Sequence, residues 1–189
     1  MCDQGRAMTD HPIIFSAPMI RAMLDGRKTM TRRLVTPTWQ RVRACDRLWV
    51  RESFATDVLT NRPKYKATFE SDMAATFAAY RDYLPRDPLW RPAIYMPRWA
   101  SRLTLTVTVV KIERLNDIST HDAQAEGIDV GPLSASGCKN EFRQLWESLH
   151  GAGSWAANPE VVALTFTVAK QNIDERAESA MKRAAAEPT

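Results

Sequence analysis

The residues best suited to chemistry gather in segment 26–33, which reads GRKTMTRR. Lys28, Thr31 and Arg33 follow a glycine that can end a helix, and in an emerging strand Thr31 and Arg33 share one face. A bulge or turn after the helix would bring Lys28 toward the same cleft. A cationic cleft of this kind suits a phosphate-bearing partner. The alternative is a solvated basic face without a ligand.

The charge of the chain is compatible with a phosphate-bearing partner but does not establish one. The 189 residues have a formal net charge of +4 at pH 7. The positive excess is local, because nine basic residues between positions 21 and 51 face only Asp25 and Asp46. Summed charge of one sign attracts phosphates over long range, but a solvated basic face carries the same charge.

Length and composition exclude several classes of protein. The chain fits one compact domain, with 44% hydrophobic and 25% charged residues. No apolar run approaches the roughly 20 residues that cross a bilayer, and the polar first residues lack a signal-peptide core. Three separated cysteines without a CxxC pair exclude a zinc ribbon and a disulfide scaffold, and three scattered histidines argue against a metal. We expect a cytoplasmic monomer without a membrane partner, metal or cofactor.

The elements that must position segment 26–33 follow from local patterns. Segment 1–11 is polar and is expected to be a disordered leader, in which Met8 could be the biological start. Segment 171–189 is expected to be a polar tail. Strands are expected at 12–15, 47–54, 102–115 and 161–168. Helices are expected after Ser16, from Ser119 to Gly127 with Asp122 as the capping partner, and along the stripe of Phe142, Leu145, Trp146 and Leu149.

Segment 55–92 interrupts this pattern with prolines, charges and aromatic residues. We interpret it as an insertion with a helical middle near 73–83, which covers one side of the core or acts as a mobile lid. Around it, several short strands are interrupted by short helices, and a Gly-rich nucleotide turn is missing. The sequence therefore predicts an α+β fold, a small mixed β-barrel over residues 12–170 rather than a doubly wound sheet.

Four motifs follow one another along the chain. They are GxKxxTxR at 26–33, DRLWVRE at 46–52, WRPAIYMPRWASR at 90–102 and a helix at 118–128 that ends in AEGI. Together they resemble ASCH domains, small β-barrels related to the PUA fold of RNA-modifying proteins, and the third resembles a block of the larger prophage members. Cys45 replaces the usual glycine of the family, at a position that we expect to need a turn conformation that glycine adopts easily.

The resemblance implies a PUA-like barrel and, for some compact bacterial members, an amidohydrolase that removes the acetyl group of N4-acetylcytidine. It assigns the catalytic roles to Lys28, Thr31 and Glu126. A threonine hydroxyl becomes a nucleophile when a base takes its proton, and Lys28 is such a base only if burial and neighbouring arginines lower its pKa against the effect of Glu126. The structural alternatives are a Thr31 that is only a strand residue, an exposed Glu126, and a Lys28 paired with Asp25.

Further candidates would bind the substrate. An aromatic ring between arginines can stack a base while the guanidinium groups hold phosphate, although Trp99 could equally seal the bottom of the barrel. His121 is a secondary candidate. The predicted binding residues are Arg33, Glu52, Arg98, Trp99 and Arg102.

Other ASCH members bind or cleave RNA, so two rivals stand beside the amidohydrolase. One is a non-catalytic module that binds single-stranded RNA. The other is a ribonuclease with Lys28 and Glu126 as acid and base. Fold does not decide among the three.

Overall fold

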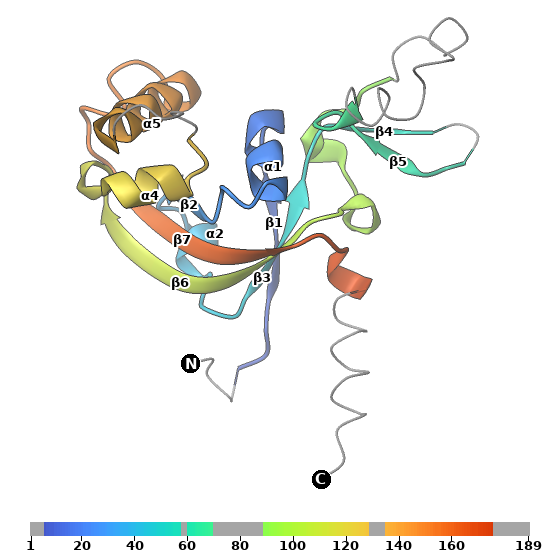
Figure 1. The fold of residues 1–189 in the computed structure, drawn as a ribbon. Helices are drawn as coiled ribbons and strands as arrows, with labels where there is room; N and C mark the ends of the chain where they lie inside the picture. Colours follow the sequence, from blue (N-terminus) through green and yellow to red (C-terminus); the bar gives the residue numbers. More distant parts are fainter. Residues whose placement is uncertain (1–5, 58–59, 70–88, 129–134, 176–189) are drawn as a thin grey trace, which may run out of the picture. The chain divides into compact units, whose positions relative to one another are not determined.

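The computed structural model describes residues 6–57, 60–69, 89–128 and 135–175 (Figure 1). These residues form a mixed α+β fold, as predicted, with a five-stranded sheet in the order β1-β3-β6-β7-β2 and a hairpin of β4 and β5. The strands are β1 (Asp10–Ile14), β2 (Met30–Leu34), β3 (Arg47–Arg51), β4 (Phe54–Thr56), β5 (Pro63–Tyr65), β6 (Thr104–Arg114) and β7 (Glu160–Ala169). The helices are α1 (Ala17–Leu24), α2 (Pro37–Gln40), α4 (Thr120–Ala125) and α5 (Ala135–His150), with 3-10 turns η2 (Ala93–Tyr95), η3 (Arg98–Ala100) and η4 (Leu115–Asp117). The sheet order ends at β1 and β2, and closure into a barrel stays a prediction.

The N-terminal segment enters the fold earlier than expected. β1 begins at Asp10, inside the predicted leader 1–11. The buried carboxylate of Asp46 accepts a hydrogen bond from the main-chain N–H of Thr9 at 3.0 Å. Arg47 binds the Asp10 carboxylate through Nε and Nη2, each at 2.8 Å. These contacts hold the end of the leader against β3, whereas its first five residues lie outside the described part of the chain.

Cys45 has the backbone conformation predicted for its position. Its φ of 74° lies in the left-handed region that glycine adopts without strain. Its N–H donates to the carbonyl oxygen of Val107 at 2.7 Å, so the turn is anchored on β6. Cys45 is also disulfide-bonded, a pairing that the cysteine spacing did not indicate.

Most predicted elements are present with shifted ends. The strands expected at 102–115 and 161–168 are β6 and β7. The strand expected at 47–54 is divided between β3 and β4, because the N–H of Glu52 faces the sulfur of Met96 at 3.3 Å instead of a neighbouring strand. The cap of α4 is confirmed: the Ser119 hydroxyl accepts the N–H of Asp122 at 3.0 Å.

The chain divides into two compact units. The first comprises Met1–Asp10, Ala22–Arg47 and Leu105–Val168. The second comprises His11–Arg21, Leu48–Thr104 and Ala169–Thr189.

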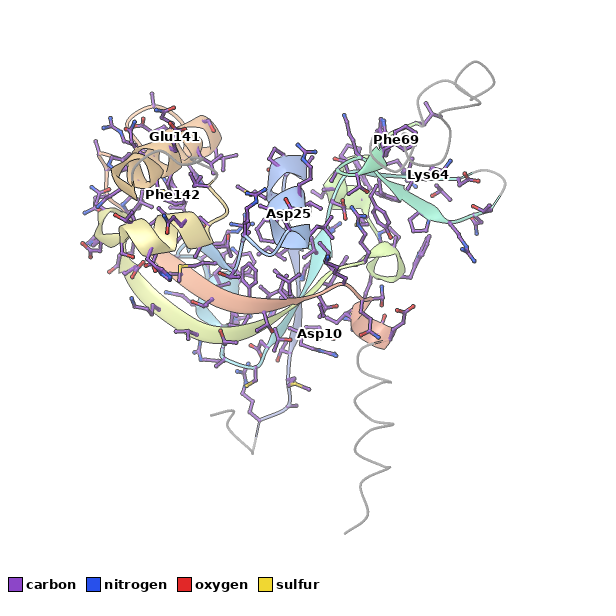
Figure 2. All side chains as sticks on the ribbon, viewed as in Figure 1. Asp10, Asp25, Lys64, Phe69, Glu141 and Phe142 are labelled. Carbon is purple, nitrogen blue, oxygen red and sulfur yellow. The ribbon has the colours of Figure 1, made fainter. Side chains whose placement is uncertain are left out.

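One hydrophobic cluster of the first unit lies where α4 and α5 pack together (Figure 1). Phe142 and Trp146 of the predicted helical stripe are buried there, and Phe142 is labelled in Figure 2. Leu149 of the same stripe is exposed, because α5 turns that position away from the core. The other buried members are Leu115, Ile118, Ala123, Cys138 and Val161.

The second unit contains the described ends of the predicted insertion 55–92 and the start of the predicted tail. Its core joins Phe54, Met96 and Ala100, with Tyr65 packed against them. The helical middle expected near 73–83 lies outside the described residues. The tail predicted from position 171 begins inside the fold, because Ile173 is fully buried.

Candidate functional site

Lys28 is positioned by the end of α1 and by the turn that follows this helix. Gly26 has a φ of 76°, which confirms the predicted helix stop. The N–H groups of Arg27 and Lys28 both donate to the carbonyl oxygen of Ala22, at 2.8 and 3.0 Å. Lys28 then forms an isolated antiparallel bridge with Glu126. This bridge brings the end of the α1 segment to the end of α4, before β2 begins.

Gly127 allows this close approach. It follows Glu126, the C-cap residue of α4, and has a φ of 88°. A Cβ atom at this position would lie 2.9 Å from the Cβ atoms of both Ala22 and Lys28, closer than such atoms pack. A residue without a side chain therefore closes the helix and makes room for Lys28.

The Lys28 amine and the Glu126 carboxylate form a buried ion pair. Nζ lies 2.8 Å from Oε2 of Glu126, and the two side chains are 0% and 4% exposed. Nζ also donates to the main-chain oxygens of Glu126 and Met30, each at 2.8 Å. Three acceptors match the three protons of an ammonium group. Two structural alternatives are therefore wrong: Glu126 is not exposed, and Lys28 does not pair with Asp25, which instead binds Arg27 at 2.9 Å.

The surroundings of Lys28 act on its pKa in opposite directions. Burial lowers the pKa of the Lys28 amine below its ordinary value. The charge and hydrogen bond of Glu126 oppose this effect, whereas the positive charges of Arg33 and Arg32 add to it. These are the directions that the sequence analysis predicted, with full rather than partial burial as the main cause.

Thr31 lies in β2, opposite Leu164 of the antiparallel strand β7. Its side chain is buried, yet its hydroxyl forms no hydrogen bond with any residue of the described part of the chain. The hydroxyl is thus close in sequence to the Met30 carbonyl that binds Lys28, but it is not bonded to the amine. A strand residue and a nucleophile both fit this arrangement.

Arg32, a residue outside the predicted site, joins three acidic side chains into what we call the Arg32 cluster. Its Nη2 binds Oε1 of Glu113 at 2.7 Å and Oδ2 of Asp122 at 2.9 Å. Its Nη1 lies 3.3 Å from Oε1 of Glu126. One signal was available in the sequence, because Asp122 and Glu126 are four residues apart and thus share a face of the helix.

Asp122 is the most accessible of the three acids in the Arg32 cluster. Burial raises its pKa, but the hydrogen bond and charge of Arg32 outweigh burial, so the pKa of Asp122 is lower than usual. The Ser119 hydroxyl and Lys111 act in the same direction. Arg32 therefore favours the charged state of Asp122.

Arg33, the predicted substrate-binding arginine, lies on the other face of β2. It is half-buried, with its guanidinium carbon 5.8 Å from the ring centre of Trp39. Burial lowers the pKa of Arg33, and Glu126 opposes this effect. Arg33 shares the strand face of Thr31, as the alternation predicted.

Glu52 and Arg102, predicted to bind substrate, bind each other within the second unit. Nε and Nη2 of Arg102 reach the two carboxylate oxygens of Glu52, at 2.9 and 3.0 Å. Nη1 of Arg102 also donates to the Thr68 hydroxyl at 3.1 Å, and its guanidinium lies 4.0 Å from the ring centre of Tyr65. Burial raises the pKa of Glu52 while Arg102 opposes it. The two residues thus form an ion pair, and their role in substrate binding stays a prediction.

Trp99 and its neighbour Arg98 are at the surface of the second unit. Trp99 is 58% exposed, so it does not seal a barrel interior. Arg98 binds the carboxylate of Asp174, with Nη2 and Oδ1 2.7 Å apart. His121, the secondary candidate, is exposed at the start of α4. Exposure of the Trp99 ring leaves it available for stacking.

The described residues hold no group of three His, Cys, Asp or Glu side chains arranged for a metal ion. Their helices are all too short or too polar to cross a lipid bilayer.

Comparisons with known proteins add little to this geometry. No protein-family model matches the chain, and no curated protein matches it. One solved structure, the crystal structure of protein EF3133 from Enterococcus faecalis V583, is described by the family model DUF984. It aligns with 89% of this chain and 84% of its own, with 14% identity and a TM-score of 0.43. At that score the likeness carries no argument about fold or function.

Proposed function

We propose that the chain is an ASCH-domain protein with a PUA-like barrel, whose Lys28, Thr31 and Glu126 hydrolyse the N4-acetyl amide of cytidine. One observation carries the proposal: the Lys28 amine and the Glu126 carboxylate are paired at 2.8 Å in a site where both are almost fully buried. A buried ion pair adds little stability over hydrophobic residues of the same size. Groups with shifted pKa values concentrate at functional sites.

The first step in this mechanism is the loss of a proton from the Lys28 ammonium to water. Burial lowers the pKa of the amine and so favours this loss, while Oε2 of Glu126 stays within hydrogen-bond reach of Nζ and orients the neutral amine. A neutral amine has two protons, so it can keep only two of its three acceptors and gains a lone pair. Release of the Met30 carbonyl turns that lone pair toward the neighbouring residue, Thr31. The amine then has the role of a general base.

The second step is acyl transfer to Thr31. The amine takes the hydroxyl proton while Oγ1 forms a bond to the acetyl carbon, and the carbonyl electron pair moves to the oxygen. The guanidinium of Arg33, on the same strand face, stabilises that oxyanion. When the C–N4 bond breaks, N4 takes the proton from Lys28 and cytidine leaves. Water then hydrolyses the acetyl ester, which releases acetate and restores the Thr31 hydroxyl.

The test uses a matched pair of variants at position 31. The purified protein is incubated with N4-acetylcytidine, and cytidine is measured by chromatography. Because the Thr31 hydroxyl bonds to no described side chain or main-chain group, Thr31→Val should fold normally and release no cytidine. Thr31→Ser keeps a hydroxyl and should retain activity. Full activity of Thr31→Val, or no release by the folded wild-type protein, would overturn the proposal.

Two further variants test the other roles. Lys28→Ala and Glu126→Ala should each abolish cytidine release. Both remove one half of a buried ion pair, so circular dichroism must first show that they fold. A folded Lys28→Ala variant with full activity rules out Lys28 as the base.

A second candidate function, binding of single-stranded RNA, rests on the second unit. Tyr95 and Trp99 are both exposed and lie four residues apart, and Arg98 directly precedes Trp99. Stacking on an aromatic ring contributes roughly 1–3 kcal/mol per base. Trp99→Ala should weaken binding of a single-stranded oligonucleotide, whereas Leu149→Ala, an equally exposed apolar residue, should not. Cleavage of the RNA that is lost in Lys28→Ala would instead indicate the ribonuclease.

A further inference from the structure

Arg32 is the most enclosed guanidinium of the first unit. Its side chain is 1% exposed. Its acidic partners come from two elements, Glu113 from β6, and Asp122 and Glu126 from α4 and its cap. The family resemblance points to the next residue, Arg33, so neither motif nor spacing assigns a role to Arg32.

The two oxygens of Glu126 are divided between two cations. Oε2 faces the Lys28 amine at 2.8 Å, and Oε1 faces Nη1 of Arg32 at 3.3 Å. A carboxylate held through both oxygens cannot rotate about its last bond. The position of Arg32 is itself fixed by Nε and Nη2, which bind Glu113 and Asp122.

The charges around this arrangement are nearly balanced. Glu113, Asp122 and Glu126 supply three negative charges, and Glu113 also meets Lys111 of its own strand at 3.2 Å. Arg32 and Lys28 supply two positive charges, and Arg33 acts on both Lys28 and Glu126. His121 lies 3.7 Å from Asp122 and adds a positive charge only when protonated. Without Arg32, the negative charge of these carboxylates would stabilise the Lys28 ammonium more strongly.

We infer that Arg32 is a positioning residue: it holds Oε1 of Glu126 so that Oε2 faces Lys28, and it takes up part of the negative charge that would otherwise bind the ammonium. The catalytic consequence of this inference rests on the proposed function, whereas the contacts of Arg32 do not. Arg32 competes with Lys28 for one carboxylate and so makes the amine easier to deprotonate.

The test measures the titration of Lys28 directly. The lysine side chains are labelled with 13C and 15N, and the Lys28 signal is assigned by its loss in Lys28→Ala. Arg32→Gln should raise the pKa of Lys28, because a like charge is lost and Glu126 is left to Lys28 alone. Arg32→Lys keeps the charge and should raise it less. Arg47→Gln breaks another partly buried arginine–carboxylate pair of the same unit and should leave it unchanged.

A second variant, Glu113→Gln, should shift the pKa of Lys28 in the opposite direction, and it provides the test if Arg32→Gln does not fold. Glu113→Gln removes a negative charge that holds Arg32, so Arg32 acts more strongly on Glu126 and the pKa of Lys28 should fall. A Lys28 titration that is unchanged in Arg32→Gln, or that moves upward in Glu113→Gln, would overturn the inference.

Kinetics then separate the inference from the proposed function. With N4-acetylcytidine, Arg32→Gln should lose about 10²-fold in kcat, with KM little changed, because the catalytic pair is misplaced. The rising limb of its pH profile should move to higher pH, a shift that lost stability alone does not produce. If the wild type releases no cytidine while the Lys28 titration shifts as expected, the proposed function fails and the positioning role of Arg32 is supported.

Discussion

The Lys28 amine donates hydrogen bonds to two oxygens of Glu126, the side-chain Oε2 and the main-chain carbonyl, each at 2.8 Å. The two residues are 98 positions apart in the sequence. The first contact forms an ion pair, and the second ties the amine to the end of α4. The position of the helix and the chemistry of the amine therefore depend on the same contacts.

A methyl group at Gly127 should damage this arrangement. Gly127 and Gly151 have similar φ values, 88° and 93°, so replacing either by Ala costs roughly 1–2 kcal/mol of backbone strain. A Cβ at Gly151 meets open space, whereas one at Gly127 meets Ala22 and Lys28 at 2.9 Å. Gly127→Ala should therefore lose about 1–3 kcal/mol more than Gly151→Ala in urea unfolding. Equal losses would show that the contact is not tight.

Removing one partner of the Lys28–Glu126 ion pair should cost more stability per residue than removing both partners. Lys28→Met leaves the Glu126 carboxylate with less compensation, and Glu126→Leu leaves the Lys28 ammonium without its charged partner. Each single change should cost about 3–5 kcal/mol of unfolding free energy. The double variant should lose less than the sum of the two, since neither charge is then stranded. Additive losses in a double-mutant cycle would argue against coupling.

Tyr65 should titrate later than an ordinary tyrosine. Burial raises its pKa to about 12; Arg102 lowers it, and Glu52 and Glu175 raise it. Below pH 10 the phenol is protonated in both the folded and unfolded states, so its contribution to stability is fully present. Between pH 10 and about 12 the unfolded chain loses this proton first, and the contribution declines.

The measurement is tyrosinate absorbance during an alkaline titration. One of the four tyrosines should ionise near pH 12, and Tyr65→Phe should remove that step. Tyr95→Phe changes an exposed ring and should leave it in place. A late step that survives in Tyr65→Phe would contradict the prediction.

Asp122 should contribute to stability at neutral pH and lose this contribution in acid. Its pKa is lower in the folded state, so the stabilisation is present above the ordinary carboxyl value near 3.9 and disappears as the pH falls through the folded-state pKa. Asp122→Asn should therefore reduce stability at pH 7 and flatten its decline in acid. In an Arg32→Gln background the same change should have little pH dependence, because Arg32 supplies most of the stabilisation. Unfolding midpoints in urea across this pH range provide the check.

The sequence alone was sufficient for features that arise from neighbouring residues. The alternation in β6, the Ser119 cap of α4, the stops at Gly26 and Gly127, and the left-handed turn at Cys45 each depend on local backbone geometry. The pairing of Lys28 with Glu126 was expected only through a family resemblance.

Tertiary structure decided which side chains meet. Glu52 and Arg102 were each predicted to bind substrate, but the fold pairs them with each other. Arg32 differs from Arg33 by one strand position, which places it on the opposite face of β2, beside the acids of α4 and β6. Local patterns set the period of each element, but contacts between elements depend on how they pack. Burial then shifts the pKa of groups such as Lys28, and no local pattern reports how deeply a side chain is buried.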